Sequence, residues 1–278
     1  MRCKAGNGAI AILPFYGIAV QRTDAVYEAC DFLILWHFTQ ALRVALADDA
    51  IGGIVIDVDS PGGSVYGVME LADEIYRSRA RKPIFAIANG LAASGAYWIA
   101  SAASELYVTP GARSAASACM IHVDLSKGLQ KAGIETTLIA VGKFKSEGNP
   151  FQPRGADARA AMQKRVDTYY RAFVANVAKH RNVPESAARN GMGHGRLLDA
   201  ERANRQKMVD GVAAFDEAID ILIQRICHGS ARALSLRGVR PRAQCHIVET
   251  PHSPSMGTAS RPAKRSAVRQ REIELLSL

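Results

Sequence analysis

The chain has 278 residues, of which 48% are apolar, so it can bury one substantial core and still leave residues for a tail or a helical appendage. Its formal net charge of +9 is unevenly spread, because residues 225–278 hold ten Lys/Arg against three Asp/Glu and so contribute +7. We therefore expect one main domain over residues 1–226 and a basic, flexible tail over residues 227–278. Because the remaining body is nearly neutral, we do not expect nucleic acid as a partner.

The cysteines and the N-terminus bear on where the protein works. An odd number of cysteines, without a CxxC or a Cys/His pair at metal spacing, argues against a disulfide framework and for a reducing cytoplasm; they are Cys3, Cys30, Cys119, Cys227 and Cys245. The first apolar run, residues 9–20, is interrupted by Pro14 and Gly17 and does not resemble a signal peptide. No stretch is long enough to span a bilayer, so we expect a protein without a membrane span.

Short apolar runs alternate with longer segments of helical periodicity along the chain. The runs predict strands near residues 9–20, 53–58, 83–88, 105–109 and 135–141. The longer segments predict helices near residues 33–48, 65–79, 92–103, 157–181 and 215–226. This alternation is typical of an α/β fold with a parallel sheet and crossover helices, followed here by a helical C-terminal part.

Two glycine turns follow predicted buried strands. The first turn reads Asp-Ser-Pro-Gly-Gly over residues 59–63, and the second reads Ala-Ser-Gly-Ala over residues 93–96. Glycines at such positions let backbone N–H groups face a ligand or a developing oxyanion, and Ser94 would lie at the carboxyl edge of the sheet. Taken singly, each turn is also explained by tight packing or helix capping.

A serine nucleophile needs a base, and two residues could supply one. A lysine such as Lys145 acts only when neutral, so its pKa would have to fall from about 10.4 by roughly three units, or about 4 kcal/mol. His122 needs no such shift, but it needs an orienting carboxylate, and Asp124 is too near in sequence to serve with certainty. The residues alone leave this choice open.

The ordered motifs together resemble the signal peptide peptidase A family of serine peptidases. They are Ser60-Pro61-Gly62-Gly63, Ala92-Ala93-Ser94-Gly95-Ala96, and Gly142-x-x-Lys145 with Asn149-Pro150. The likeness covers about residues 8–225 and is strongest to the short members that act as phage head-maturation, or capsid, proteases. It implies a ClpP/crotonase-like fold, a Ser94–Lys145 catalytic dyad, and an oxyanion hole formed by the N–H groups of Gly63 and Gly95.

The resemblance also implies partners and a setting. It implies a homo-oligomeric ring or dome, in which serine and lysine can come from neighbouring subunits. The substrate would be a protein or peptide, such as a phage capsid or scaffold protein or a signal-peptide-like segment, in the host cytoplasm or a virion precursor. No metal or cofactor is expected, since there is no Walker loop and no HExxH motif.

One segment departs from the family pattern and keeps other functions open. Where relatives carry a Gly-Ser-Ile-Gly-Val-like segment, this chain reads Ser-Ala-Ala-Ser-Ala over residues 114–118. A catalytically impaired relative that acts as an assembly component is therefore an alternative. A Clp-type peptidase that uses His122 as base is another, and a crotonase-type acyl-CoA enzyme is a third.

Overall fold

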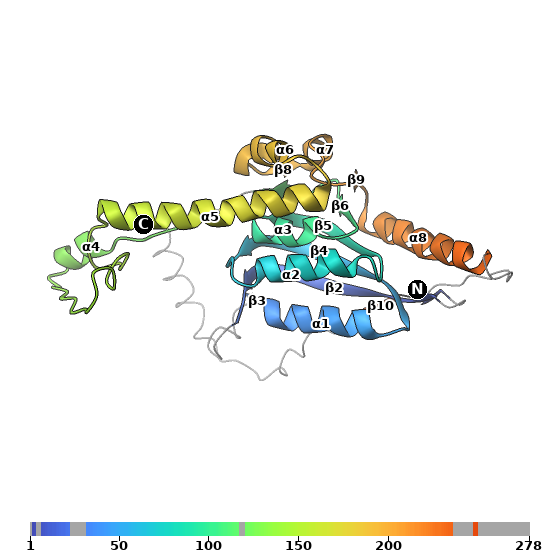
Figure 1. Ribbon diagram of the computed structural model, residues 1–278, viewed down its shortest axis with the longest axis horizontal. Helices are drawn as coiled ribbons and strands as arrows, with labels where there is room; N and C mark the ends of the chain where they lie inside the picture. The colour runs from blue at the N-terminus through green and yellow to red at the C-terminus, as the bar shows by residue number, and fades with distance from the viewer. Residues whose placement is uncertain (1, 4–6, 23–31, 117–119, 236–246, 250–278) are drawn as a thin grey trace, which may run out of the picture.

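A computed structural model describes residues 2–3, 7–22, 32–116, 120–235 and 247–249. Within these residues one mostly parallel sheet forms the centre of the molecule (Figure 1). Its main path runs β1-β2-β4-β5-β6-β9, with β3 and β10 against β2, β7 against β5, and β8 against β7. The strands are β1 Arg2–Cys3, β2 Asn7–Val20, β3 Phe32–Ile34, β4 Ile51–Gly63, β5 Ile84–Ala93, β6 Glu105–Val108, β7 Arg113–Ala115, β8 Leu198–Asp199, β9 Gly211–Val212 and β10 Ile247–Glu249.

Helices cover both faces of this sheet, which confirms the predicted α/β class. One face packs against α1, α2, α3 and the second half of α5, and the other packs against α8. Most strand pairs are parallel, as the crossover helices require. The helices are α1 Leu35–Ala47, α2 Val68–Ser78, α3 Gly95–Ser101, α4 Ser126–Lys131, α5 Ala156–Arg181, α6 Glu185–Asn190, α7 Ala200–Arg205 and α8 Phe215–Ser235, with a 3-10 turn at Met192–Gly195.

The central strands β4 and β5 are apolar on both faces because both faces are covered. All residues from Ile54 to Val58 in β4 are buried, including Asp57. Alternate residues point to opposite sides, so Ile54 and Ile56 join the core beneath α2 and α3, whereas Val55 joins the core beneath α8. The predicted strands at residues 9–20, 53–58, 83–88 and 105–109 are confirmed in place.

Helix α8 extends beyond the expected end of the main domain at residue 226. It continues to Ser235, and residues 247–249 form β10 in parallel with β2. The remainder of the predicted tail, residues 236–246 and 250–278, lies outside the described residues.

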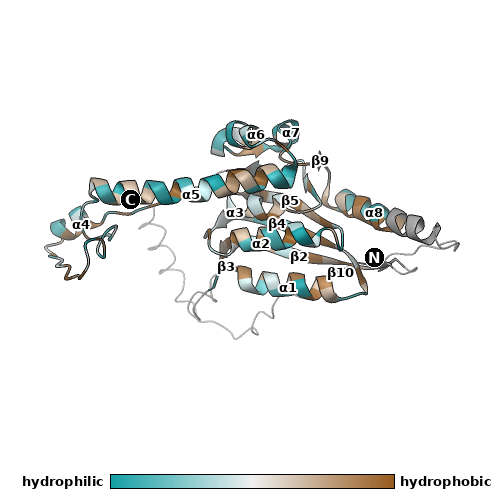
Figure 2. Ribbon diagram, in the orientation of Figure 1, coloured by the Kyte–Doolittle hydropathy of each residue, from teal (hydrophilic) through white to brown (hydrophobic). Residues whose placement is uncertain are grey.

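Helix α5 is 26 residues long, or about 39 Å, and only part of it lies on the sheet. Its buried residues, apart from Ala158, fall between Phe173 and His180. Figure 2 shows the same division, with hydrophobic residues concentrated in the half of α5 that lies beside α3. The first half projects away from the sheet and accompanies a region we call the distal segment, residues 120–155.

The expected strand at residues 135–141 is wrong, and it falls in this distal segment. The structure has irregular chain there, and Ile139 and Val141 are each 96% exposed. The β-branched run satisfies the local preference for strand, but that preference is expressed only where a neighbouring strand supplies hydrogen bonds and packing. Within the distal segment the described chain forms α4 and turns, and no such strand is present.

Candidate active site

Ser94 lies in a strained turn between β5 and α3. Its backbone has φ 52° and ψ −123°, a conformation that glycine adopts readily and that costs a residue with a Cβ about 1–3 kcal/mol. The turn is held on both sides, because the Ser94 N–H donates to the Ala115 carbonyl at 3.0 Å and the Ser94 carbonyl accepts from the Trp98 N–H at 3.0 Å. Every residue of α3 behind it is buried. A partly exposed serine is thus fixed at the carboxyl end of β5 by a rigid support.

The glycine turn after β4 lies directly against Ser94. A Cβ on Gly62 would lie 2.9 Å from the Ser94 Cβ and 2.8 Å from the Ala93 carbonyl oxygen, so only glycine fits there. Gly62 also has φ +93°, a second reason for glycine. The Gly63 nitrogen lies 4.0 Å from the position that a Cβ on Gly95 would take. The structure therefore brings together three of the four predicted site residues: Ser94, Gly63 and Gly95.

Ser60 organises this turn, a role that the sequence analysis did not assign. Its hydroxyl is fully buried, donates to the Gly17 carbonyl at 2.6 Å and accepts from the Gly62 N–H at 3.1 Å. The link ties the β4 turn to the end of β2. Its signal in the sequence was present, because serine and glycine side by side after a buried strand suggest a side chain bonded to its own turn.

The segment that departs from the family pattern supports Ser94 through its backbone. Strand β7 pairs in parallel with residues 91–93 of β5, and its Ala115 carbonyl is the acceptor for Ser94. A backbone contact of this kind does not depend on the side chains. Ser114 is fully buried, and its hydroxyl has no hydrogen-bond partner among the described residues. Ser117 and Ala118 lie outside the described residues.

Lys145 does not lie with Ser94 in this chain. It is exposed in the distal segment, where its N–H donates to the Gly142 carbonyl at 3.1 Å in a series of turns. Nearby, the Asn149 side chain receives the Phe151 N–H and donates to the Ser146 carbonyl, so the loop has internal structure of its own. Figure 1 shows α4 and the surrounding loop at the far end of α5, well separated from α3.

His122 also lies in the distal segment. Its Nε2 atom is buried without a hydrogen-bond partner among the described residues. The neighbouring Asp124 is exposed, and its pKa is lowered mainly by hydrogen bonds from Ser126, with a smaller contribution from His122. Among the described residues, the Nε2 atom of His122 forms no hydrogen bond with Ser94.

A polar group at the carboxyl edge of the sheet also escaped the sequence analysis. Asp57 is 6% exposed on β4, and the Tyr16 hydroxyl donates to its Oδ2 atom. Burial raises the pKa of Asp57, whereas Tyr16 and the Asn89 amide lower it, and the nearby Asp59 raises it again. The Asp59 carboxylate lies close to Gly90: a Cβ on Gly90 would be 2.6 Å from the Asp59 Oδ1 atom.

Two features, a metal-binding group and a membrane-spanning helix, are absent from the described chain. Across residues 2–3, 7–22, 32–116, 120–235 and 247–249, no three His, Cys, Asp or Glu side chains are grouped so that they could bind a metal ion. In the same ranges no helix combines the length and apolar character needed to cross a bilayer.

Comparison with known proteins places the chain among peptidases of one family. The model of peptidase family S49 matches residues 77–225. Head-tail preconnector protein GP5 of Enterobacteria phage P21 is 37% identical over 63% of this chain and 35% of its own length. Capsid assembly protease C of Escherichia phage lambda is 32% identical over 80% of this chain and 52% of its own. The chain thus spans between a third and about half of the length of these relatives.

Solved structures show a similar fold. A mutant of 1510-N, a membrane-bound stomatin-specific protease, superposes with a TM-score of 0.50 at 14% identity, covering 78% of this chain and 85% of that one. The neighbour has a ClpP-like fold, which confirms the predicted ClpP/crotonase-like architecture. The class that this likeness defines is therefore a ClpP-like α/β fold.

The particular family follows from the match to more than half of the chain. The protein belongs to peptidase family S49, the family that includes a putative signal peptide peptidase of Enterococcus faecium, 27% identical over 67% of this chain and 54% of its own.

Proposed function

We propose that this chain is a serine endopeptidase that uses Ser94 as nucleophile, Lys145 as general base and the N–H groups of Gly63 and Gly95 as oxyanion donors. The observation that carries this proposal is the strained Ser94 turn, packed against a glycine turn that leaves no room for a Cβ. Strain of this kind persists only where surrounding structure maintains it, and it concentrates at functional sites. Gly95 is also the first residue of α3, where N–H groups lack intrahelical partners.

The reaction would follow the general course of acyl transfer. The neutral amine of Lys145 takes the proton of the Ser94 hydroxyl while the Ser94 oxygen attacks the peptide carbonyl carbon. The two N–H groups stabilise the negative oxygen of the tetrahedral intermediate, a contribution of about 3–4 kcal/mol for a single donor in related sites. The C–N bond breaks as Lys145 returns the proton to the leaving amine. Water, activated by the same lysine, then hydrolyses the acyl-enzyme.

Lys145 would reach Ser94 from a neighbouring subunit. The distal segment carries the lysine far from the serine of its own chain and exposes an unusual number of large apolar side chains: Met120, Ile121, Val123, Leu125, Ile134, Ile139, Val141, Phe144 and Phe151. A concentration of this kind is characteristic of a protein interface. Burial there would also favour the neutral amine that a base requires. We therefore propose a homo-oligomer that completes each site across an interface.

The substrate would be an extended segment of another protein, added beside an edge of the sheet. The relatives include one named a capsid assembly protease, which supports phage capsid or scaffold proteins as substrates in a host cytoplasm or virion precursor. A signal-peptide-like segment is the other substrate class within the family.

A second function, an assembly component with little or no peptidase activity, has one observation in its favour. The relative at 37% identity is named a head-tail preconnector protein, a name that does not mention peptidase activity. The altered residues 114–118 would be the reason for lost activity in that case.

Subunit mixing tests the proposed dyad. Ser94→Ala and Lys145→Met should each abolish cleavage of unfolded casein, and a mixture of the two, dissociated and reassembled, should recover part of the wild-type rate. Recovery requires that one chain supplies serine and another supplies lysine. His122→Ala and Lys143→Met serve as matched controls and should retain activity.

The other outcomes separate the alternatives. An inactive His122→Ala beside an active Lys145→Met would assign the base to His122. If wild type assembles but cleaves nothing, the assembly-component function replaces the peptidase.

A further inference from the structure

An open depression lies at the C-terminal end of α2, away from the serine turn. It has a volume of about 540 Å³ and is lined by Tyr76, Arg77, Arg79, Ala80 and Ser104. The Ser104 hydroxyl accepts the N–H of Ile84, the first residue of β5, at 3.1 Å. Ser94 follows the last residue of the same strand. At about 3.3 Å per residue the ten residues of β5 separate the two places by roughly 30 Å, so this depression is not part of the peptidase site.

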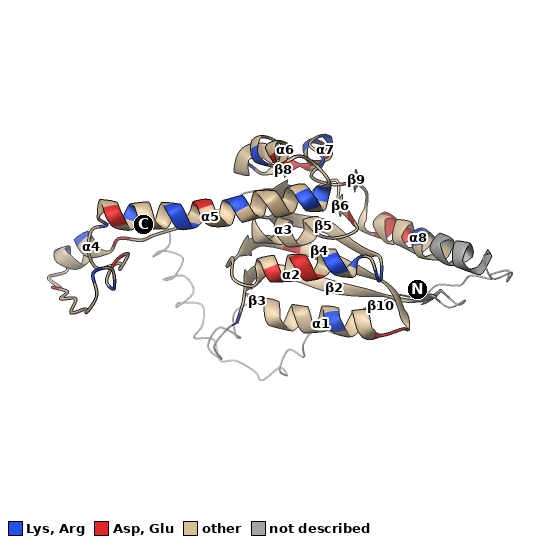
Figure 3. Ribbon diagram, in the orientation of Figure 1, with Lys and Arg blue, Asp and Glu red and all other residues tan. Residues whose placement is uncertain are grey.

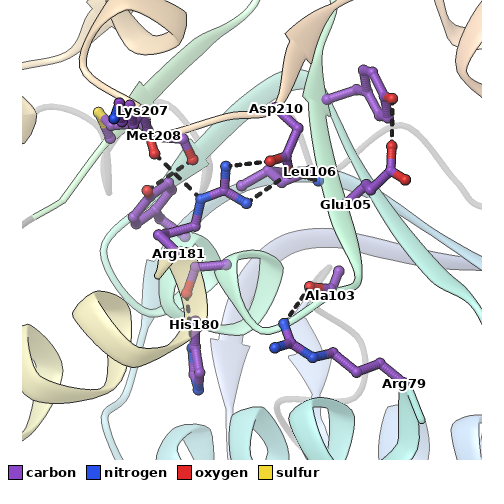
Figure 4. A network of polar contacts seen from close by, with 12 residues as sticks. Arg79, Ala103, Glu105, Leu106, His180, Arg181, Lys207, Met208 and Asp210 are labelled. Carbon is purple, nitrogen blue, oxygen red and sulfur yellow. Dashed lines mark hydrogen bonds and ion pairs between the residues drawn. The ribbon is translucent and has the colours of Figure 1, made fainter. Parts of the chain in front are cut away.

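Two cations, one directly after α2 and one on α5, lie over the ring of Tyr76. The guanidinium carbon of Arg79 lies 3.8 Å from the ring centroid, and the Nζ atom of Lys179, on α5, lies 4.6 Å from it. Figure 3 shows the blue ends of α2 and α5 on the same side of the molecule. Arg79 is further fixed by a hydrogen bond from Nη1 to the Ala103 carbonyl at 3.2 Å (Figure 4). One edge of a positioned guanidinium is thereby used, and its remaining N–H donors stay available.

No carboxylate neutralises this group of cations. Within the described residues, none of the salt bridges includes Arg77, Arg79 or Lys179. On α2, Glu74 is paired with Arg43, and Asp73, one helical turn before Arg77, forms no salt bridge among the described residues; on α5, Arg181 is paired with Asp210. Positive charges that converge without partners are unfavourable unless an anion joins them.

His180 is stacked on the Tyr76 ring, and its pKa is lowered in part by the same cations. It is 4% exposed, lies 5.0 Å from the Tyr76 centroid at an interplanar angle of 26°, and contacts the Ser101 hydroxyl through Nδ1 at 3.1 Å. Burial lowers the pKa of His180 to about 4, and Lys179, Arg79 and Arg181 add to this effect. No acidic group opposes the shift, and the imidazole stays neutral beneath the tyrosine.

We propose that this depression binds a phosphate group as its dianion, held by Arg79 and Arg77, which line it, and by Lys179, which lies over the ring of the lining Tyr76, with the Ser104 hydroxyl as a further donor. Three unpaired cations suit a doubly charged oxyanion better than a single carboxylate. The planar donors of arginine match two oxygens of a phosphate at once. A hydroxyl that already accepts an N–H can donate its own proton to the third oxygen. Because the depression is open, the phosphate can be free or carried on a phosphorylated side chain of another protein.

Isothermal titration of the full chain with inorganic phosphate tests this proposal, at an ionic strength held constant with sodium chloride. The wild type should bind phosphate, and Arg79→Gln with Lys179→Gln should weaken binding by at least about tenfold. Lys164→Gln with Arg165→Gln removes the same charge from exposed positions of α5 and should leave affinity within about twofold of wild type. A phosphoserine peptide beside its unphosphorylated form distinguishes the two sources of the group.

Arg79→Lys separates a built site from a diffuse basic surface. It keeps the charge but loses the paired planar donors, so phosphate should bind about tenfold more weakly than to wild type. Equal affinity of Arg79→Lys and wild type overturns the proposal, as does equal loss in the Lys164/Arg165 control or the absence of any phosphate binding above chloride. Casein cleavage is measured separately, and an inactive peptidase that still binds phosphate leaves this proposal intact.

Discussion

The sheet body and the distal segment of this chain differ in where their apolar side chains lie: buried in the body and exposed in the distal segment. In the body, α3 is buried along its whole length and the serine turn is enclosed by β2, β4, β5 and β7. In the distal segment, residues 120–155, large apolar side chains face solvent, and Ile139 and Val141 are almost fully exposed. The body therefore holds the proposed nucleophile and the proposed oxyanion donors by itself, whereas the distal segment holds a proposed base that a neighbouring subunit would have to cover.

The difference also separates stability from activity. Substitutions in the body remove contacts that a single chain already makes, so they should change its free energy of unfolding. Substitutions in the distal segment remove contacts that only an assembly would make, so they should change oligomeric state and activity with little effect on the fold.

The largest expected effect is on the serine itself. Ser94→Ala should lower casein cleavage by about 10⁴-fold or more, because the nucleophile is lost while the scaffold remains. Ser94→Gly should be equally inactive but should raise the free energy of unfolding by about 1 kcal/mol, since glycine adopts φ 52° without strain. Urea unfolding of the three proteins checks this. A Ser94→Gly variant less stable than wild type would show that the turn is not strained.

The next largest effect is expected for the ion pair between Arg181 and Asp210. Arg181 is only 5% exposed in its side chain; it pairs with both oxygens of Asp210, which also accepts the Leu106 N–H at 2.7 Å (Figure 4). Asp210→Ala should lower the free energy of unfolding by about 3–5 kcal/mol, because it leaves a buried charge without its partner. Glu185→Ala breaks the exposed pair with Arg189 and should cost at most about 0.5 kcal/mol. Similar losses from both would contradict this account.

Acid should weaken the body through His180. Its pKa of about 4 in the folded chain lies below the ordinary value of 6.5, so the unfolded chain binds the proton more readily. This contribution to stability is complete above pH 6.5 and declines by about 3 kcal/mol as the pH falls to about 4. Unfolding by urea at pH 7, 5.5 and 4.5 should give a steeper decline in wild type than in His180→Gln. The exposed His37→Gln is the control, and it should follow wild type.

The smallest effect on stability, and a large one on assembly, is expected in the distal segment. Ile139→Ser with Val141→Ser should change the free energy of unfolding by no more than about 0.5 kcal/mol, because both side chains are already in solvent. Analytical ultracentrifugation should nevertheless show a smaller assembly than wild type, with reduced cleavage. Ile75→Ala, at a fully buried position of α2, should cost about 2–5 kcal/mol. An unchanged assembly in the double variant would remove the distal segment from the interface.

Much of the body could be predicted because its signals are local. Continuous apolar runs identified β4 and β5, and helical spacing identified α1, α2 and α5. The two glycine turns placed Ser94, Gly63 and Gly95 at one edge, since the carboxyl ends of neighbouring parallel strands meet there. In each case the residues that fix the structure are near in sequence or repeat with the period of the element.

Other features depend on partners far away in the chain. The role of Ser60 depends on the Gly17 carbonyl, 43 residues earlier. The support of Ser94 by β7 depends on a backbone pairing that the side chains of residues 114–118 do not predict. The Arg79–Tyr76–Lys179 group joins α2 to a helix one hundred residues later. No local sequence pattern predicts contacts between residues so far apart in the chain.

The sequence by itself determined the sheet, its crossover helices and the glycine turns beside Ser94, because apolar periodicity and glycine requirements act over a few residues. Only the tertiary structure decided that residues 135–141 form no strand and that Lys145 lies apart from Ser94. The physical reason is that a β-branched run forms a strand only where a neighbouring strand supplies hydrogen bonds and packing, and the described part of the distal segment, which carries Lys145, has no such neighbour.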